Sequence, residues 1–149
     1  MENFIKKLKD IGELIVFKHS VFALPFIFAA MIVASKQVND SAWFGFKLLI
    51  LGALCAVSAR NFAMAFNRYK DEDIDKLNPR TANRPSVDGR IGKDNMRIFI
   101  AANGVIFIVC AYFINSLAFW LSFPILAVLA GYSIFKRFRS EEHTSELQS

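Results

Sequence analysis

The sequence predicts an all-α protein, a polytopic bundle of transmembrane helices. Apolar residues make up 54% of the chain, 16 of its 149 residues are Phe, and the mean hydropathy is +0.35. These values are typical of a membrane protein. The charged residues cluster between apolar runs instead of alternating through them. The formal charge of +5 therefore indicates membrane topology and not a nucleic-acid-binding surface.

The first element, residues 1–18, combines four lysines with apolar residues at helix-like intervals. This pattern predicts an amphipathic helix that lies along the cytoplasmic surface of the membrane. A signal peptide is the rival interpretation, because a basic start followed by an apolar run can resemble one. No convincing small-residue cleavage site follows, and further apolar segments come after it, so we expect the segment to be retained.

Four apolar runs follow, and each predicts a membrane helix: Val21 to Ala34, Ala42 to Phe66, Ile98 to Leu117 and Ala118 to Phe135. The first is short, since a span takes about 20 residues. Lys18 and Lys36 can extend it by snorkelling, and Pro25 is expected to kink it. Only the pair Asn115-Ser116 separates the last two runs, which predicts a helical hairpin.

Three residues inside the apolar runs carry chemistry of their own. Cys55 and Cys110 show no spacing typical of a zinc site or a redox pair, so we interpret them as packing residues. Arg60 is different, because a charge within a span must face a polar cavity or a partner. It lies seven residues before Asn67, on the same side of the helix. A structural salt bridge to a neighbouring helix is the alternative.

The linker after the second run begins with NRYKDEDIDKLNPRTANRP, Asn67 to Pro85. If the helix continues into it, Asn67, Asp71 and Asp75 fall four residues apart and share one face. Amide and carboxylate oxygens suit Mg²⁺, which proteins bind through one or two carboxylates together with substrate phosphates. A solvated cytoplasmic turn is the plain alternative for such a mixture of acids and bases.

Other residues of the linker complete this expectation. The arginines Arg68, Arg80 and Arg84 could bind the same phosphate oxygens, because the guanidinium fork matches them. The helix should end near Leu77, with a turn at Asn78-Pro79. Asp73 falls off the metal-binding stripe, and we expect it to be solvated, together with Glu72.

The identity of the residues in this stretch gives evidence beyond their spacing. NRxxDxxxD followed by NPRTANRP resembles the first aspartate-rich motif of the UbiA superfamily of intramembrane prenyltransferases, more usually written NDxxDxxxD. The form AMAFNRYKDEDIDKLNPRTANRP is most similar to the branch that prenylates 4-hydroxybenzoate and related aromatic acids. At the end of the fourth run, GYSIFKRF resembles the family's tyrosine and Lys-Arg motif, here Tyr132, Lys136 and Arg137. A positive-inside flank is the alternative interpretation of the basic pair.

The resemblance implies a fold and a reaction. Residues 1–138 would be the four N-terminal helices of a nine-helix prenyltransferase fold, without its second aspartate-rich motif. The whole protein would transfer a polyprenyl group from its diphosphate to an aromatic acid, with Mg²⁺, for ubiquinone or menaquinone synthesis. The implied metal ligands are Asn67, Asp71 and Asp75, with Arg68 beside them, and the implied diphosphate-binding residues are Arg60, Arg80, Arg84, Lys136 and Arg137.

The basic residues predict the orientation. They gather before the first run, in the linker and after the fourth run, so this side should be cytoplasmic in a bacterial inner membrane. The four-helix piece alone is expected to be inactive, because the first motif lacks its partner. The alternative from another class is a non-catalytic four-helix membrane protein or transporter segment whose linker contacts lipid.

The last eleven residues, RSEEHTSELQS, do not fit the rest. They match, in one frame, the translation of a sequencing-library adapter. Residues 139–149 are therefore expected to be adapter-derived, with residue 138 the last native one, and they take no part in the fold prediction. A native acidic C-terminus is the alternative.

Overall fold

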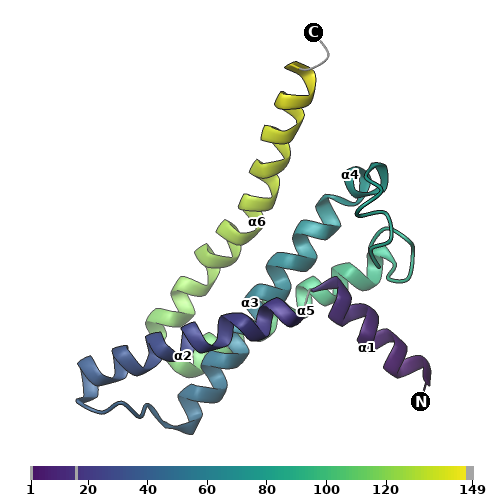
Figure 1. Cartoon of the computed structure of the whole chain (residues 1–149). Coiled ribbons are helices and arrows are strands. Elements are labelled where there is room, and N and C mark those ends of the chain that lie inside the picture. The colour runs from purple at the N-terminus through teal and green to yellow at the C-terminus, as the bar shows by residue number, and fades with distance from the viewer. Residues whose placement is uncertain (1, 16, 147–149) are drawn as a thin grey trace.

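A computed structural model describes the backbone of residues 2–15 and 17–146, and the side chains of residues 5–7, 9–15, 21–22, 24–38 and 40–135. Every regular element within these residues is a helix (Figure 1). The elements are α1 Glu2–Leu14, α2 Phe17–Asn39, α3 Gly45–Lys70, α4 Glu72–Leu77, α5 Lys93–Ile114 and α6 Ser116–Glu146. The prediction of an all-α fold is confirmed.

Three helices are long and apolar enough to cross a membrane: α3, α5 and the part of α6 from Ser116 to Phe135. They correspond to the second, third and fourth predicted runs, although α3 begins three residues after the second run and α5 ends three residues before the end of the third. The first run lies in α2, a helix of 23 residues with Pro25 inside it, whose described apolar part is Leu24–Val38. At about 1.5 Å per residue the whole of α2 would match a hydrocarbon core of about 30 Å.

The packing of α3 against α5 is the most extensive helix contact. Asn61 Nδ2 donates to Asn103 Oδ1 at 3.1 Å, and Asn103 Nδ2 donates to the Phe99 carbonyl at 2.8 Å. At Gly104 the helices approach closely, since a Cβ there would lie 3.5 Å from the Phe62 ring. In lipid the hydrophobic effect does not drive helices together, because the surrounding chains are as apolar as the helix surfaces. Close packing at small residues and interhelical hydrogen bonds hold the helices together instead.

The cysteines lie within the same packing. Cys55 of α3 lies 3.9 Å from the Phe107 carbonyl of α5, and Cys110 is buried. Both are free thiols. The burial of Cys110 agrees with its interpretation as a packing residue, and Cys55 is half-buried.

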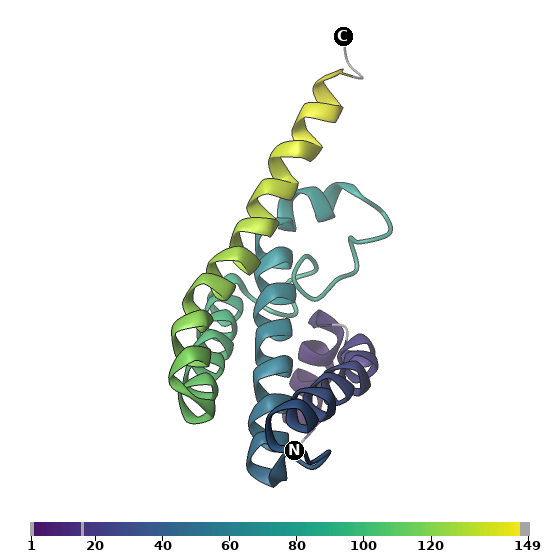
Figure 2. The ribbon, with the colours of Figure 1, turned by 90° about the vertical axis from the view of Figure 1, so that its left-hand side faces the viewer.

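The hairpin predicted at Asn115-Ser116 is also present. Asn115 leaves α5 in an extended conformation, and its side-chain Oδ1 accepts a hydrogen bond from the Ala118 amide at 2.7 Å. One residue therefore ends α5 and starts α6. Figure 2 shows the consequence: this turn lies at one end of the bundle, and α4 with its loop lies toward the other, in the direction in which α6 rises. The acid-rich motif and the second half of α6 are thus brought to the same end.

The first helix forms as predicted, and its end packs on the bundle. Leu14 is buried in a cluster with Ala65 of α3 and Met96 of α5. The exposed Lys6, Lys7 and Lys9 fit the predicted polar face, but the end of α1 is anchored on the bundle. Burial of Leu14 between two membrane helices supplies the reason, because it removes this side chain from water.

The buried amide pair predicts a measurable stability effect. Asn103→Ala leaves the Asn61 side-chain amide without its partner on α5, and should lower the free energy of unfolding by about 1 kcal/mol. Val105→Ala is the control, since it also truncates a side chain of α5, but one that is exposed. Unfolding in mixed detergent micelles measures both. An equal loss in the two variants would show that the hydrogen bonds contribute nothing beyond side-chain size.

Candidate active site

The corner between α3 and α4 places the three predicted metal ligands in register. α3 ends at Lys70, Asp71 caps it, and α4 begins at Glu72. The helical hydrogen-bond spacing nevertheless continues through the break, because the Asp71 amide donates to the Asn67 carbonyl at 2.9 Å and the Asp75 amide donates to the Asp71 carbonyl at 2.8 Å. Asn67, Asp71 and Asp75 are therefore consecutive steps along one side of the corner, as the spacing predicts.

Asp75 is buried and is held from two directions. Its Oδ2 accepts a hydrogen bond from Arg84 Nη1 at 2.6 Å, and its backbone carbonyl accepts one from Thr81 Oγ1 at 2.8 Å. The residue is 7% exposed and Arg84 is half-buried. A candidate metal ligand and a candidate phosphate ligand thus contact each other directly, so the loop after α4 folds back onto the acidic corner.

A tight turn makes that return possible. Asn78 is extended, with φ −100° and ψ 117°, as expected of a residue before proline. Its Oδ1 accepts the Arg80 amide at 3.0 Å, and its carbonyl accepts the Thr81 amide at 2.9 Å. The predicted end of the helix at Leu77 and the turn at Asn78-Pro79 are confirmed. The turn leaves Arg80 exposed.

Arg68 is the most enclosed basic residue of this corner. It is 8% exposed, and its Nε has no hydrogen-bond partner among the described residues. It interacts electrostatically with Arg84, Asp75 and Glu13. A buried guanidinium nitrogen without a partner is costly, and it is a donor that an anionic ligand can satisfy.

An apolar groove of about 400 Å³ lies between α3 and α6 and ends at Asn67. Its walls are Ala63, Met64, Val128, Leu129, Tyr132 and Ser133. Apart from Tyr132, these wall residues were not singled out from the sequence, where only helical spacing could have placed them on facing sides. Arg60 lies on α3 and is half-buried. Lys136 and Arg137 follow Tyr132 on α6, and their side chains lie outside the described residues.

The donor atoms at the corner are of the types that magnesium binds in proteins. Asn67 offers an amide oxygen, and Asp71 and Asp75 offer carboxylates, one oxygen of Asp75 being engaged by Arg84. Within the described residues no three His, Cys, Asp or Glu side chains gather to hold a metal. Two carboxylates and an amide match the pattern in which Mg²⁺ takes its remaining ligands from water and phosphate oxygens.

The expectation that Glu72 is solvated is wrong, whereas Asp73 is exposed as expected. Glu72 is 9% exposed, and its two carboxylate oxygens contact Lys76 at 2.7 Å and Lys93 at 3.1 Å. The start of α5 supplies Lys93, a contact that spacing along α4 does not reveal. The hydrogen bond from Lys76, with the second from Lys93, holds the pKa of the Glu72 carboxyl below its usual range, against the opposing effect of burial.

Comparison with known proteins gives consistent matches. The sequence model described as "UbiA prenyltransferase family" matches residues 23–141. The chain is 30% identical over 115 residues to the 4-hydroxybenzoate octaprenyltransferase of Dechloromonas aromatica (strain RCB), covering 76% of this chain and 37% of that protein. It is 34% identical over 116 residues to the protoheme IX farnesyltransferase of Flavobacterium johnsoniae, covering 76% of this chain and 35% of that protein.

A solved structure matches as well. It is the apo structure of a UbiA homolog from Aeropyrum pernix K1, with a TM-score of 0.70 and 34% sequence identity. The match covers 80% of this chain and 42% of that one. The chain therefore spans less than half the length of these relatives.

The pairing of Glu72 predicts a pH dependence of stability. A carboxyl whose pKa is lowered by folding stabilises the fold fully above the ordinary glutamate pKa of about 4.3, and this contribution is lost as the pH falls through the lower folded value. Glu72→Gln should therefore be less stable than wild type at pH 7, and the difference should shrink below pH of about 4. Thermal unfolding at both pH values measures it. A difference that does not change with pH would mean that the Glu72 charge contributes nothing.

Proposed function

Because this chain belongs to the UbiA prenyltransferase family, we propose that the whole protein transfers a polyprenyl group from its diphosphate to an acceptor within the membrane. The observation that carries the proposal is the position of Asn67. This one residue belongs both to the acidic corner and to the end of the apolar groove between α3 and α6. A ligand with a polar head and a long apolar tail matches that arrangement.

The groove suits the prenyl chain, and the corner suits the diphosphate. Apolar side chains of α3 and α6 exclude water from the allylic carbon, which matters because water would compete with the acceptor. Arg68 is enclosed beside Asp75 and Arg84, where its guanidinium can bind the diphosphate oxygens. Arg60, Arg80, Lys136 and Arg137 complete the proposed set of diphosphate-binding residues.

Asn67, Asp71 and Asp75 would hold the magnesium ion. When bound, Mg²⁺ would neutralise charge on the diphosphate and so make it a better leaving group. The diphosphate leaves with the electrons of the C–O bond, a carbon of the acceptor bonds to the allylic cation, and the acceptor then releases a proton. Arg68 and its neighbours favour this step by stabilising the charge that develops on the leaving oxygen.

For the acceptor we propose an aromatic acid similar to 4-hydroxybenzoate, in ubiquinone or menaquinone synthesis. The amino-acid sequence of the motif from Asn67 to Pro85 supports this acceptor, and so does the similarity to a 4-hydroxybenzoate octaprenyltransferase. Protohaem is the second candidate, because relatives described as protoheme IX farnesyltransferases are 33–34% identical over a similar share of this chain. Magnesium-dependent prenyl transfer is common to both proposals.

The protein is an integral membrane protein, and we propose that its polar end faces the cytoplasm of a bacterial cell. The basic residues before α2 and in the linker support this orientation. A soluble metal ion and a membrane-bound diphosphate would then meet at the corner of α3 and α4. We also propose that residues 1–138 are inactive alone, since the matched relatives are more than twice as long as the region they share with this chain.

The metal assignment predicts different effects for two neighbouring aspartates. In the full-length protein, Asp71→Ala should lower kcat by at least about a hundredfold, because it removes a ligand of the charge-neutralising ion. Asp73→Ala is the matched control and should retain activity, since Asp73 lies off the stripe and is exposed. Magnesium-dependent transfer of a radiolabelled prenyl group measures both. Equal tolerance of the two changes would remove the metal assignment.

The acceptor is tested separately in the same assay. The purified full-length protein in lipid vesicles is given one polyprenyl diphosphate and either 4-hydroxybenzoate or protohaem. Product with 4-hydroxybenzoate alone is the expected result. Product with protohaem alone would transfer the assignment to the second candidate, while leaving the proposed prenyl transfer intact.

A further inference from the structure

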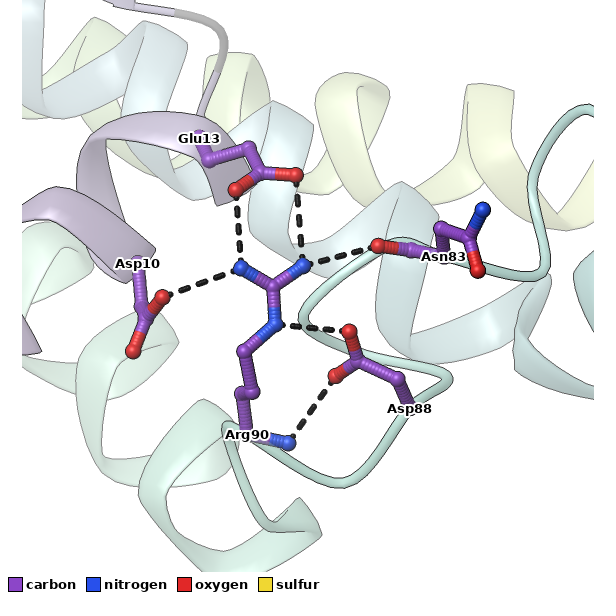
Figure 3. Close-up of polar contacts among 5 residues, drawn as sticks. All are labelled: Asp10, Glu13, Asn83, Asp88 and Arg90. Atoms are coloured by element: carbon purple, nitrogen blue, oxygen red, sulfur yellow. Dashed lines mark hydrogen bonds and ion pairs between the residues drawn. The ribbon is translucent and has the colours of Figure 1, made fainter.

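Arg90, in the loop before α5, joins segments that are far apart in the sequence (Figure 3). Its guanidinium donates to Asp10 Oδ1 at 3.1 Å and to both carboxylate oxygens of Glu13, at 2.9 and 3.3 Å. It also donates to Asp88 Oδ2 at 2.6 Å and to the Asn83 carbonyl at 2.8 Å. All three guanidinium nitrogens are engaged, and the partners come from both α1 and the loop.

The contact with Asn83 leads directly to the candidate active site. Asn83 precedes Arg84, whose guanidinium holds Asp75 at 2.6 Å. The same stretch of loop is closed by further backbone bonds, from the Val87 amide to the Arg84 carbonyl at 2.8 Å and from the Ile91 amide to the Pro85 carbonyl at 2.9 Å. Arg90 therefore fixes the backbone from which Arg84 projects.

The other side of the contact is α1, which is itself anchored. Leu14 is 1% exposed between α3 and α5, and Asp10 is 8% exposed. Anchoring matters energetically, because isolated exposed ion pairs contribute little, whereas a network held on ordered elements loses less side-chain entropy. Glu13 and Asp88 raise the pKa of Arg90, so its charge is permanent. The family match begins at residue 23, and α1 lies before it.

We propose that Arg90, held by Asp10 and Glu13 of α1, is a positioning residue that sets Arg84 for binding the diphosphate of the substrate. Arg90 itself contacts no reacting group in this proposal. It acts through its hydrogen bond to the Asn83 carbonyl, and α1 thereby supports the loop that carries Arg84. The inference rests on the prenyl transfer proposed above, because that reaction supplies the diphosphate that Arg84 would bind.

The test compares three variants of the full-length protein in lipid vesicles. Asp10→Asn with Glu13→Gln removes the two carboxylate charges of α1 that contact Arg90, without changing side-chain size. Arg90→Lys keeps the positive charge but loses the planar guanidinium. Asp94→Asn is the control: it removes a nearby ion pair with Arg97, whose two side chains are 90% and 61% exposed. Steady-state kinetics give kcat and the KM of each substrate, and hydrogen–deuterium exchange reports on residues 79–91.

Both the double variant and Arg90→Lys should raise the KM for the polyprenyl diphosphate by roughly three- to tenfold. The reason is that a displaced Arg84 guanidinium loses part of its charge-assisted hydrogen bond to the diphosphate. The KM for the acceptor should not change, because the acceptor does not meet Arg84. Exchange in residues 79–91 should become faster. The control should match wild type in all of these. If every parameter changed together, including the KM for the acceptor, Arg90 would have a general structural role and the inference would be wrong.

Two results would overturn the inference in different ways. If wild type is active and the variants keep its KM for the diphosphate, Arg90 does not position Arg84, and the proposed function stands. If wild type shows no magnesium-dependent transfer with either acceptor, the proposed function is wrong, and the role of Arg90 in diphosphate binding is wrong with it.

Discussion

The packing of α3 on α5 is the constraint on which the rest of the structure depends. In an apolar environment each helix satisfies its own backbone, and two helices stay together only through close packing and the few polar side chains they share. Asn61, Asn103 and Gly104 supply both. Once these helices are fixed, the end of α3 and the beginning of α5 lie near each other, and the linker between them must fold over that end.

The linker meets this requirement by pairing its charges with one another and with neighbouring helices. Asp75 with Arg84, Glu72 with two lysines, and Arg90 with the acids of α1 form three contacts at one end of the bundle. The first and third hold the loop against a helix, and the second joins α4 to the start of α5. Groups that would be mobile in a solvated loop are therefore held in place before any ligand binds, and preorganised charges need little reorganisation when a ligand arrives.

Much of this was predictable from local pattern, and the rest was not for a physical reason. Apolar runs predicted the three helices that are long and apolar enough to span a membrane among the described residues, a proline predicted the end of α4, and a spacing of four predicted the alignment of Asn67 with Asp71. These depend on neighbours in the chain. The burial of Glu72 and Leu14 and the contacts of Arg90 depend on residues that helix packing brings together, up to 80 positions away. Spacing within one segment carries no information about them.

The turn at Asn115 has a consequence for how the protein enters the bilayer. Its amide donates to the Ala111 carbonyl, its carbonyl accepts the Phe119 amide, and its side chain caps α6. When a turn crosses the hydrocarbon, its polar groups lose their bound water, which costs free energy. This desolvation cost is smaller when the polar groups already form hydrogen bonds with one another. Because Asn115 makes its bonds within the turn, α5 and α6 are suited to insert together as one preformed hairpin.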